Sequence, residues 1–358
     1  MSESPMPPSG ILSLIRRGTV IPAHPLALTE ERRLDERHQR ALTRYYLAAG
    51  AGGVAVAVHT TQFEIREPEF DLLQPVLTLA AEEARAYQQK TGRDVALIAG
   101  VVGDTRQAVR EAELASRLGY HAVLLSLAAL KQADTGTLIQ HCRRVAEVMP
   151  LFGFYLQPAV GGRVLPYDFW RRFAEIENVI AIKMAPFNRY QTIDVVRGVV
   201  EAGRVDEIAL YTGNDDHILL DLVTPFPFRV GDRSVVARVV GGLLGQWAVW
   251  TRRAVEMHAQ ARRLAQSGDP IPQDFLGAAN ELTDANAALF DVAHNYAGCI
   301  AGINEVLRRQ GLLASRACLN PREDLSPGQA AEITRVQNAY PALIDDDFVA
   351  EHLQEWLR

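Results

Sequence analysis

Lys183 is the residue whose type and position most strongly suggest chemistry in this chain. Of the 37 lysines and arginines, only Lys90, Lys131 and Lys183 are lysines. Lys183 ends the apolar run 178–183, which is typical of a buried parallel strand. An amine can form a Schiff base, which a guanidinium cannot, and its pKa falls readily when it is desolvated. Lys183 is therefore a candidate nucleophile; the alternative is a strand-end lysine whose amine reaches water.

Other reactive or polar residues also follow apolar runs that are expected to be strands. In chain order this set is His59, Thr60, Thr61, Tyr155, Lys183, Thr212, Gly213 and Asn214. In a closed barrel of parallel strands, the C-terminal ends of all strands open on one face. We therefore expect these groups on one rim.

The set suits carbonyl chemistry through an imine. A neutral Lys183 would attack a ketone, and the Tyr155 phenol would move protons as the carbinolamine collapses. Hydroxyl and backbone N–H groups at Thr60 and Thr61 would hold a carboxylate beside the ketone. Structural alternatives stay open, because strand-end tyrosines also pack and paired threonines also cap turns.

Short apolar runs alternate with longer amphipathic segments, which predicts a (β/α)8 barrel of the α/β class. The expected strands are 18–23, 53–58, 95–100, 122–126, 151–155, 179–183, 208–212 and 237–242. An open doubly wound sheet is the alternative. That fold places a glycine-rich phosphate turn after its first strand, whereas residues 20–28 contain no glycine.

Composition divides the chain into three expected segments. Residues 1–13 are expected to be a flexible N-terminus, without the apolar core of a signal peptide. Residues 14–267 hold the expected barrel. Residues 268–358 begin with a proline-containing connection and are expected to form a C-terminal helical extension.

Charge and composition favour a globular protein that acts on small molecules. The net charge is −6 without a basic block, which argues against a nucleic-acid partner. No apolar run approaches the roughly 20 residues that cross a bilayer, so no membrane partner is expected. The cysteines Cys142, Cys299 and Cys318 follow no metal-binding spacing and fit a reducing, cytoplasmic compartment.

No metal site is predicted. Asp215 and Asp216 precede an apolar helix and are interpreted as N-cap residues. His24 and His59 lack a matching carboxylate cluster, so hydrogen-bonding roles are favoured for both. A metal-dependent hydrolase that uses His24, His59 and Asp215 is a remaining alternative.

Four segments carry a family resemblance when they are taken in order along the chain. They are His59-Thr60-Thr61-Gln62-Phe63, Tyr155-Leu156-Gln157-Pro158, Ile182-Lys183-Met184 and Thr212-Gly213-Asn214-Asp215. They resemble the Gly-Thr-Thr-Gly-Glu, Tyr-Asn-x-Pro, Ile-Lys-Asp and Ser-Gly-Asp-Asp segments of the dihydrodipicolinate synthase / N-acetylneuraminate lyase superfamily of class I, Schiff-base aldolases.

The resemblance implies a (β/α)8 barrel with a C-terminal helical extension, assembled as a homo-oligomer (dimer or tetramer). It implies that Lys183 forms the Schiff base, that Tyr155 is the proton-transfer phenol, and that Thr60 is a relay hydroxyl. The covalent imine needs no separate cofactor. The remaining positions that the resemblance assigns to substrate binding are His59, Thr61, Gln157, Gly213 and Asn214.

The chain departs from the synthase pattern where the second substrate is bound. Synthases carry an arginine two residues after the proline of Tyr-Asn-x-Pro, and it binds a carboxylate. Here that position is Val160, and the nearest arginine is Arg163. A pair of tyrosines after the fourth strand is replaced by the stretch 127–130, Leu-Ala-Ala-Leu. These departures argue against dihydrodipicolinate synthase activity itself.

The sequence thus predicts a lyase, either an aldolase or a dehydratase, that acts on pyruvate or a related 2-oxoacid through Lys183. The alternative is a non-catalytic 2-oxoacid-binding or regulatory protein on the same barrel, because the relay tyrosines and the carboxylate-binding arginine are missing. A lysine kept at position 183, in a chain nearly free of lysine, favours the enzyme.

Overall fold

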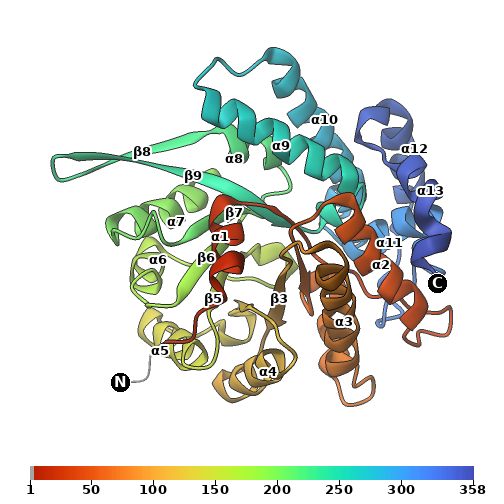
Figure 1. Ribbon diagram of the computed structural model, residues 1–358, viewed down its shortest axis with the longest axis horizontal. Coiled ribbons are helices and arrows are strands. Elements are labelled where there is room, and N and C mark those ends of the chain that lie inside the picture. The colour runs from red at the N-terminus through yellow and green to blue at the C-terminus, as the bar shows by residue number, and fades with distance from the viewer. Residues whose placement is uncertain (1–3) are drawn as a thin grey trace.

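Eight parallel strands close into a barrel in the computed structural model, which describes residues 4–358 (Figure 1). Their order is β1-β9-β7-β6-β5-β4-β3-β2, and a bridge between Ala23 and Ala55 joins the two ends of this order. The predicted (β/α)8 barrel is confirmed. The strands are β1 (Val20–Pro22), β2 (Gly53–Val56), β3 (Ala96–Val101), β4 (Ala122–Leu125), β5 (Leu151–Leu156), β6 (Val179–Ala185), β7 (Ala209–Thr212) and β9 (Arg233–Leu244).

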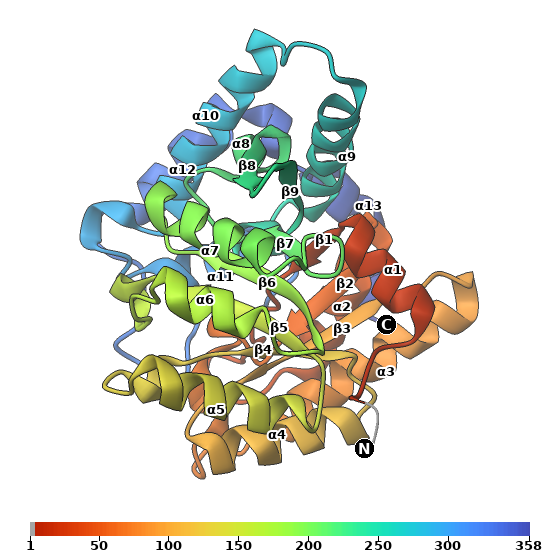
Figure 2. The ribbon, with the colours of Figure 1, turned by 90° about the vertical axis from the view of Figure 1, so that its left-hand side faces the viewer.

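Helices connect the strands and surround the barrel (Figures 1 and 2). They bury one face against the strands and expose the other, which explains their amphipathic sequences. Their bounds are α2 (Glu36–Ala49), α3 (Leu73–Thr91), α4 (Thr105–Arg117), α5 (Thr135–Ala146), α6 (Tyr167–Phe173), α7 (Arg189–Glu201), α8 (Ile218–Val223) and α9 (Thr251–Ser267).

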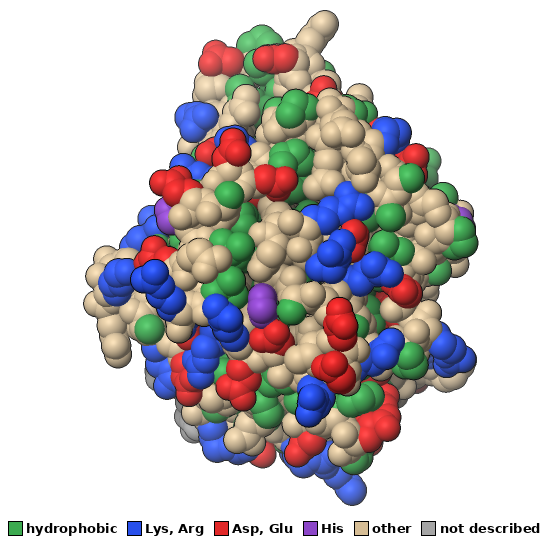
Figure 3. All heavy atoms as spheres, turned by 90° about the vertical axis from the view of Figure 1, so that its right-hand side faces the viewer, with side chains coloured by type: hydrophobic (Ala, Val, Ile, Leu, Met, Phe, Trp, Pro, Cys, Tyr) green, Lys and Arg blue, Asp and Glu red, His purple; other side chains and the backbone are tan. Residues whose placement is uncertain are grey.

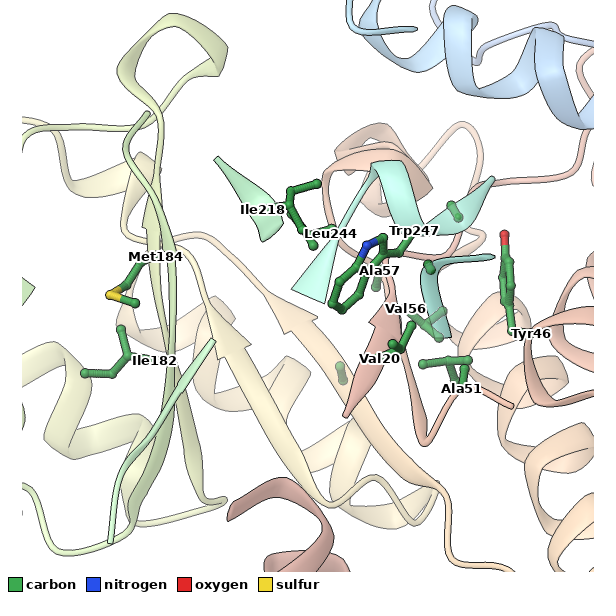
Figure 4. Close-up of a cluster of buried hydrophobic side chains, with 14 of the residues drawn as sticks. Val20, Tyr46, Ala51, Val56, Ala57, Ile182, Met184, Ile218, Leu244 and Trp247 are labelled. Atoms are coloured by element: carbon green, nitrogen blue, oxygen red, sulfur yellow. The ribbon is translucent and has the colours of Figure 1, made fainter. Parts of the chain in front are cut away.

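The strands have two buried faces, which explains why their sequences are continuous apolar runs. Successive side chains alternate between the barrel interior and the layer beneath the helices. On β6, Ile182 and Met184 belong to the helix-side core and point the same way (Figure 4). Lys183 lies between them and therefore points into the barrel.

Helix α1 (Ser9–Arg17) lies against the interior side chains of the barrel. Ile11 and Ile15 are buried, and the carbonyl of Ile15 accepts a 2.8 Å hydrogen bond from the hydroxyl of Tyr211. The helix begins inside the segment 1–13 for which the sequence predicts a flexible N-terminus, so that boundary is wrong from Ser9 onward. Residues 1–3 lie outside the described chain.

A hairpin that the sequence did not predict projects from the barrel (Figure 1). Strand β8 (Pro225–Val230) pairs antiparallel with the first half of β9, and only the second half of β9 belongs to the barrel. Prolines at 225 and 227 argue against a strand in the sequence, because proline cannot donate to a ladder. β8 tolerates them as an edge strand that pairs on one side.

The C-terminal extension packs beside α2, α8 and α9 (Figure 2). The sequence predicts one helix over 275–294, but the helix ends at Leu289. Beyond it, Asp291, Asn295 and Tyr296 adopt positive φ angles, so residues 290–298 form a loop that holds only a short 3-10 turn at Val292–His294. The helices are α10 (Gln273–Leu289), α11 (Cys299–Arg309), α12 (Gln329–Ala339) and α13 (Asp346–Trp356).

Acidic and basic side chains are interspersed on the face drawn in Figure 3, so no patch of one sign dominates it. Within residues 4–358, no helix combines the length and apolar character needed to cross a membrane.

Candidate active site

Lys183 lies near the C-terminal end of β6 and faces the barrel interior. It is only 8% exposed. Phe154 is its neighbour on β5, and the lysine Nζ lies 4.6 Å from the centre of the Phe154 ring. The amine thus stands over an aromatic wall with little water around it.

Burial lowers the pKa of the Lys183 amine to about 8, and nearby Asp215 and Cys299 oppose the shift. At such a pKa about a tenth of the amine is neutral at pH 7, against less than about a thousandth at its ordinary value. Only the neutral amine is a nucleophile. The site therefore prepares Lys183 for attack on a carbonyl carbon.

Gly213 provides the space through which the lysine side chain runs. A Cβ atom at this position would lie 2.6 Å from Cε of Lys183. The Gly213 N–H donates a 2.6 Å hydrogen bond to the carbonyl of Met184, which fixes the turn after β7 against β6. Gly213 thus lines the cavity, as predicted for a binding position, but its clearest contribution is room for the nucleophile.

Asp215 is the carboxylate that shares the cavity with Lys183. Its side chain is half-buried, and Oδ1 is fully buried without a hydrogen-bond partner in residues 4–358. Burial raises the pKa of the Asp215 carboxyl to about 7, although the neighbouring Lys183 opposes the rise. The sequence interpretation of Asp215 as an N-cap residue is wrong, because α8 begins at Ile218 and no such hydrogen bond is present.

The cavity at this end of the barrel has a volume of about 60 Å³. A buried water needs roughly 10–15 Å³ by the same measure, so a molecule of a few heavy atoms fits. Besides Lys183, Gly213, Asp215, His59 and Thr60, its walls are Ala23, Val58, Phe154, Leu156, Gln157, Val160, Ala185, Phe187, Gly245, Phe290, Tyr296 and Cys299. Most of these side chains are apolar.

Lys183 is the only lysine or arginine among the described residues that line the cavity. Val160, which stands at the position of the synthase arginine in the sequence resemblance, lines the cavity. The Arg163 guanidinium turns away and donates hydrogen bonds to the carbonyls of Leu130 and Ala133. The cavity therefore offers no second cation to an anionic group.

Two of the predicted residues after β2 line the cavity. Burial and the nearby Lys183 lower the pKa of His59 to about 4, so its imidazole is neutral at pH 7. The Thr60 hydroxyl donates a 2.8 Å hydrogen bond to the carbonyl of Ala23. Its hydrogen is thus already engaged, while its oxygen remains an acceptor.

Tyr155, predicted from the sequence as the proton-transfer phenol, does not line the cavity. It points to the helix side of β5, where its ring packs 5.4 Å from that of Trp170. Its hydroxyl oxygen accepts a 3.1 Å hydrogen bond from the N–H of Leu165. The interior positions of β5 are taken by Phe154 and Leu156, which have no hydroxyl.

Thr61 and Asn214, predicted to bind substrate, also lie behind the wall. The Thr61 hydroxyl donates to the carbonyl of His24 at 2.6 Å. Asn214 is buried, and its Oδ1 accepts a 3.1 Å hydrogen bond from the N–H of Phe187, which holds that residue at a φ of 50°. Asn214 therefore positions a cavity wall and does not face the cavity.

A loop from the extension completes the walls, and the sequence did not predict it. Residues 290–298 bring Phe290 and Tyr296 to the cavity, and Cys299 follows at the start of α11. The buried Asp291 carboxylate shapes the loop by accepting hydrogen bonds from the Gly298 N–H and the Ser326 hydroxyl. Gln157, a predicted binding residue, does reach the cavity and donates a 3.2 Å hydrogen bond to the Tyr296 hydroxyl.

The metal-hydrolase alternative has no geometric support. His24 is fully buried, and its ring hydrogen-bonds with the Thr43 hydroxyl at 2.8 Å, away from Asp215. No group of three or more histidine, cysteine or acidic side chains within residues 4–358 is arranged to hold a metal ion.

A sequence model of the dihydrodipicolinate synthetase family matches residues 17–242. The chain belongs to this family. The 4-hydroxy-tetrahydrodipicolinate synthase of Acaryochloris marina is 28% identical to it over 217 residues, which cover 58% of this chain and 68% of that protein. The family resemblance seen in the sequence is confirmed.

Solved structures share the fold of this dihydrodipicolinate synthetase family member. Dihydrodipicolinate synthase from Aquifex aeolicus superposes with a TM-score of 0.69 at 19% identity, over 92% of this chain and 99% of that chain. N-acetylneuraminate lyase from Fusobacterium nucleatum, complexed with pyruvate, gives 0.68 at 17% identity, over 91% and 98%. At these identities the likeness concerns the fold.

Proposed function

We propose that the protein is a lyase that forms a Schiff base between Lys183 and pyruvate or a related 2-oxoacid. The observation that carries this proposal is the buried Lys183 amine, with a pKa lowered to about 8, inside a cavity at the C-terminal end of the barrel. Membership in the dihydrodipicolinate synthetase family supports a pyruvate-dependent lyase in general. The protonated imine would serve as the electron sink for making or breaking the adjacent bond, in an aldol reaction or a dehydration.

Tyr296 is the hydroxyl best placed to bind the oxoacid. Because it accepts a hydrogen bond from Gln157, its own hydrogen is available to a substrate oxygen. The Thr60 oxygen can only accept, so it suits the hydroxyl of the carbinolamine and not the oxygens of the oxoacid. The sequence predicts that Thr61 helps to bind the oxoacid. In this proposal the Tyr296 hydroxyl does so instead.

The part of the substrate that differs from pyruvate would be uncharged and apolar. The walls beyond Lys183 are formed by Leu156, Val160, Phe187 and Phe290. The protonated imine at Lys183 is the cation available to the carboxylate of the oxoacid itself, and a second buried carboxylate without a partner cation costs several kcal/mol or shifts its pKa. An acceptor aldehyde or leaving group with an apolar substituent avoids that penalty, whereas one that carries a carboxylate does not.

The test is borohydride trapping with pyruvate and with a longer, apolar 2-oxoacid, followed by peptide mass spectrometry. A reduced adduct on the peptide that contains Lys183 supports the proposal, and it must vanish in Lys183→Met. Lys131→Met, at an exposed turn, is the matched control and should keep the adduct. Wild-type protein that gives no adduct with any 2-oxoacid would refute imine chemistry.

One observation favours the alternative of a 2-oxoacid-binding protein without catalysis: Tyr155, the predicted acid/base, faces the helices. Saturable binding of pyruvate without a trappable adduct would support that alternative. A homo-oligomer and a cytoplasmic location stay predictions from the sequence and the family resemblance.

A further inference from the structure

Imine chemistry needs a group that gives and takes protons beside the reacting carbons, and the residues predicted for it do not qualify. Tyr155 lies on the helix side of β5. The hydrogen of the Thr60 hydroxyl is donated to the Ala23 carbonyl. The task must fall to another group that lines the cavity.

We propose that the Asp215 carboxyl group carries out proton transfer to and from the 2-oxoacid bound at Lys183. This inference rests on the function proposed above and names the acid/base of that same site. Asp215 lies on the cavity wall with Lys183, two residues after the glycine that makes room for the lysine.

The backbone of Asp215 is anchored, and the Gln246 N–H lies close enough to its carboxylate to oppose the rise of the Asp215 pKa, but the buried Oδ1 has no hydrogen-bond partner in the described chain. The Asp215 carbonyl accepts a 2.7 Å hydrogen bond from Nδ2 of Asn286, which ties the turn to α10. A buried polar atom left unpaired is unfavourable, so a ligand that bonds to it is favoured. An oxygen fixed in this way at a cavity wall is available to a ligand.

Asp215 and Lys183 are close enough to shift each other's pKa, but they do not form a direct ion pair. Each shifts the pKa of the other, yet among residues 4–358 no carboxylate lies within the 4.0 Å ion-pair distance of the lysine amine. Both side chains line the same cavity, so a substrate held at Lys183 also lies beside Asp215. A direct ion pair would instead keep the amine protonated.

The environment of Asp215 allows both of its protonation states near neutral pH. Burial raises its pKa to about 7, Lys183 opposes the rise and Asp216 adds to it. Besides Lys183, the ionisable groups that share the cavity are the Tyr296 phenol, His59, which is neutral, and Cys299, whose pKa burial raises well above its usual value. A general acid/base works best when its pKa lies near the working pH.

Asp215 alone can supply and recover the protons that imine and enamine formation require. The neutral Lys183 amine adds to C2 of the oxoacid, and its proton moves to the new alkoxide, which gives a neutral carbinolamine. Protonated Asp215 gives its proton to the carbinolamine hydroxyl; the C–O bond breaks, water leaves, and an iminium beside an Asp215 carboxylate remains. The carboxylate then takes a proton from C3, which yields the enamine and restores the acid.

Two other cavity residues are rivals for this role. His59, with a pKa of about 4, is too weak a base and is rarely protonated at pH 7. Tyr296 has a hydroxyl, but its proposed part is to hold the oxoacid, with its oxygen accepting a hydrogen bond from Gln157. The experiment below separates Asp215 from Tyr296.

The test compares Asp215→Asn, an isosteric change, with Asp216→Asn, which removes the neighbouring exposed carboxylate. Two readouts are taken with pyruvate: borohydride trapping at Lys183 after long incubation, and exchange of the C3 protons in D₂O followed by NMR. We expect Asp215→Asn to retain the trapped adduct and to lose C3 exchange by about 10²–10⁴-fold. Asp216→Asn should stay within about threefold of the wild type in both.

The pH profile adds a readout that a structural role would not change. In the wild type, the rate of C3 proton exchange should change with pH as one group titrates near pH 7. Asp215→Glu should show the same pH dependence with a lower rate. Exchange that survives in Asp215→Asn, or that is lost only in Tyr296→Phe, would overturn the assignment to Asp215. Wild-type protein without an adduct would instead refute the proposed function, so the two failures are distinguishable.

Discussion

A Cβ atom on Gly213 would lie 2.6 Å from Cε of Lys183, which is closer than non-bonded atoms approach. The nucleophile can follow its path into the cavity only because residue 213 has no side chain. The turn cannot retreat, because the Gly213 N–H is bonded to the carbonyl of Met184 at 2.6 Å. Two separate segments, β6 and the turn after β7, therefore define the position of one amine.

Gly213→Ala is expected to slow adduct formation at Lys183 by at least about tenfold, because the lysine must leave its rotamer. Overpacking of this kind costs about 1–3 kcal/mol, so the protein should still fold. The rate of borohydride trapping with pyruvate measures the effect. Gly277→Ala is the control, because a Cβ there meets no atom within 4 Å. Equal trapping rates in both variants would contradict the steric argument.

Tyr155→Phe is expected to leave trapping and C3 proton exchange within about threefold of the wild type. It should lower the free energy of unfolding by about 1–3 kcal/mol, because the Leu165 N–H loses its acceptor. Urea unfolding measures the second effect. Tyr211→Phe removes another buried hydroxyl, at the α1 end of the barrel, and is the matched control. If C3 proton exchange fell by about 100-fold in Tyr155→Phe and not in Tyr211→Phe, the Tyr155 hydroxyl would be shown to take part in proton transfer.

Lys183 should make stability depend on pH in a defined window. Burial lowers its pKa from the ordinary 10.5 to about 8 in the folded protein, so between these values the unfolded chain binds more protons. Stability contributed by this group therefore rises with pH over that interval, by up to about 3 kcal/mol. Denaturant unfolding of the wild type and of Lys183→Met is measured at several pH values. The free energy of unfolding of the wild type minus that of Lys183→Met should become more positive from about pH 8 to pH 10. A constant difference would mean that the amine is not desolvated.

Val160→Arg would place a cation on the apolar wall. If imine chemistry operates, aldehydes that carry a carboxylate should gain about tenfold in kcat/KM relative to apolar aldehydes, since a charge-assisted hydrogen bond becomes available. Competition between a neutral and an anionic aldehyde, followed by product analysis, measures the ratio. Val164→Arg, on an exposed part of the same segment, is the control and should change nothing. An unchanged preference in Val160→Arg would show that this wall does not meet the acceptor.

The barrel and Lys183 were predictable because both follow from patterns within single strands. A continuous apolar run indicates a strand buried on both faces, and a lone lysine at its end is unusual whatever lies around it. The direction of Tyr155 was not predictable in this way. Because strand side chains alternate, a shift of one position exchanges the interior and exterior faces. The register of β5 against β6 shifts between Leu151 and Phe152. The family motif that begins at Tyr155 gives no sign of this shift.

The sequence also did not predict that residues 290–299 help to form the cavity wall, and the reason is different. Phe290 lies inside, and Tyr296 just beyond, an apolar helical pattern that the sequence continues to residue 294. The helix ends at Leu289, and the buried Asp291 carboxylate beyond it binds the later Gly298 N–H and the Ser326 hydroxyl. Such long-range hydrogen bonds leave no periodic signal. Three residues of the cavity wall therefore came from a segment that was interpreted as packing alone.

The order of the chain has a consequence for its synthesis. Lys183 leaves the ribosome well before Phe290, Tyr296 and Cys299, the residues that complete its surroundings. Chains are made at about 5–20 residues per second, so the nascent barrel exists for several seconds with its mouth uncovered. During this interval Lys183 lacks the walls that Phe290, Tyr296 and Cys299 provide. Its enclosure is thus completed last, when the end of the chain has docked.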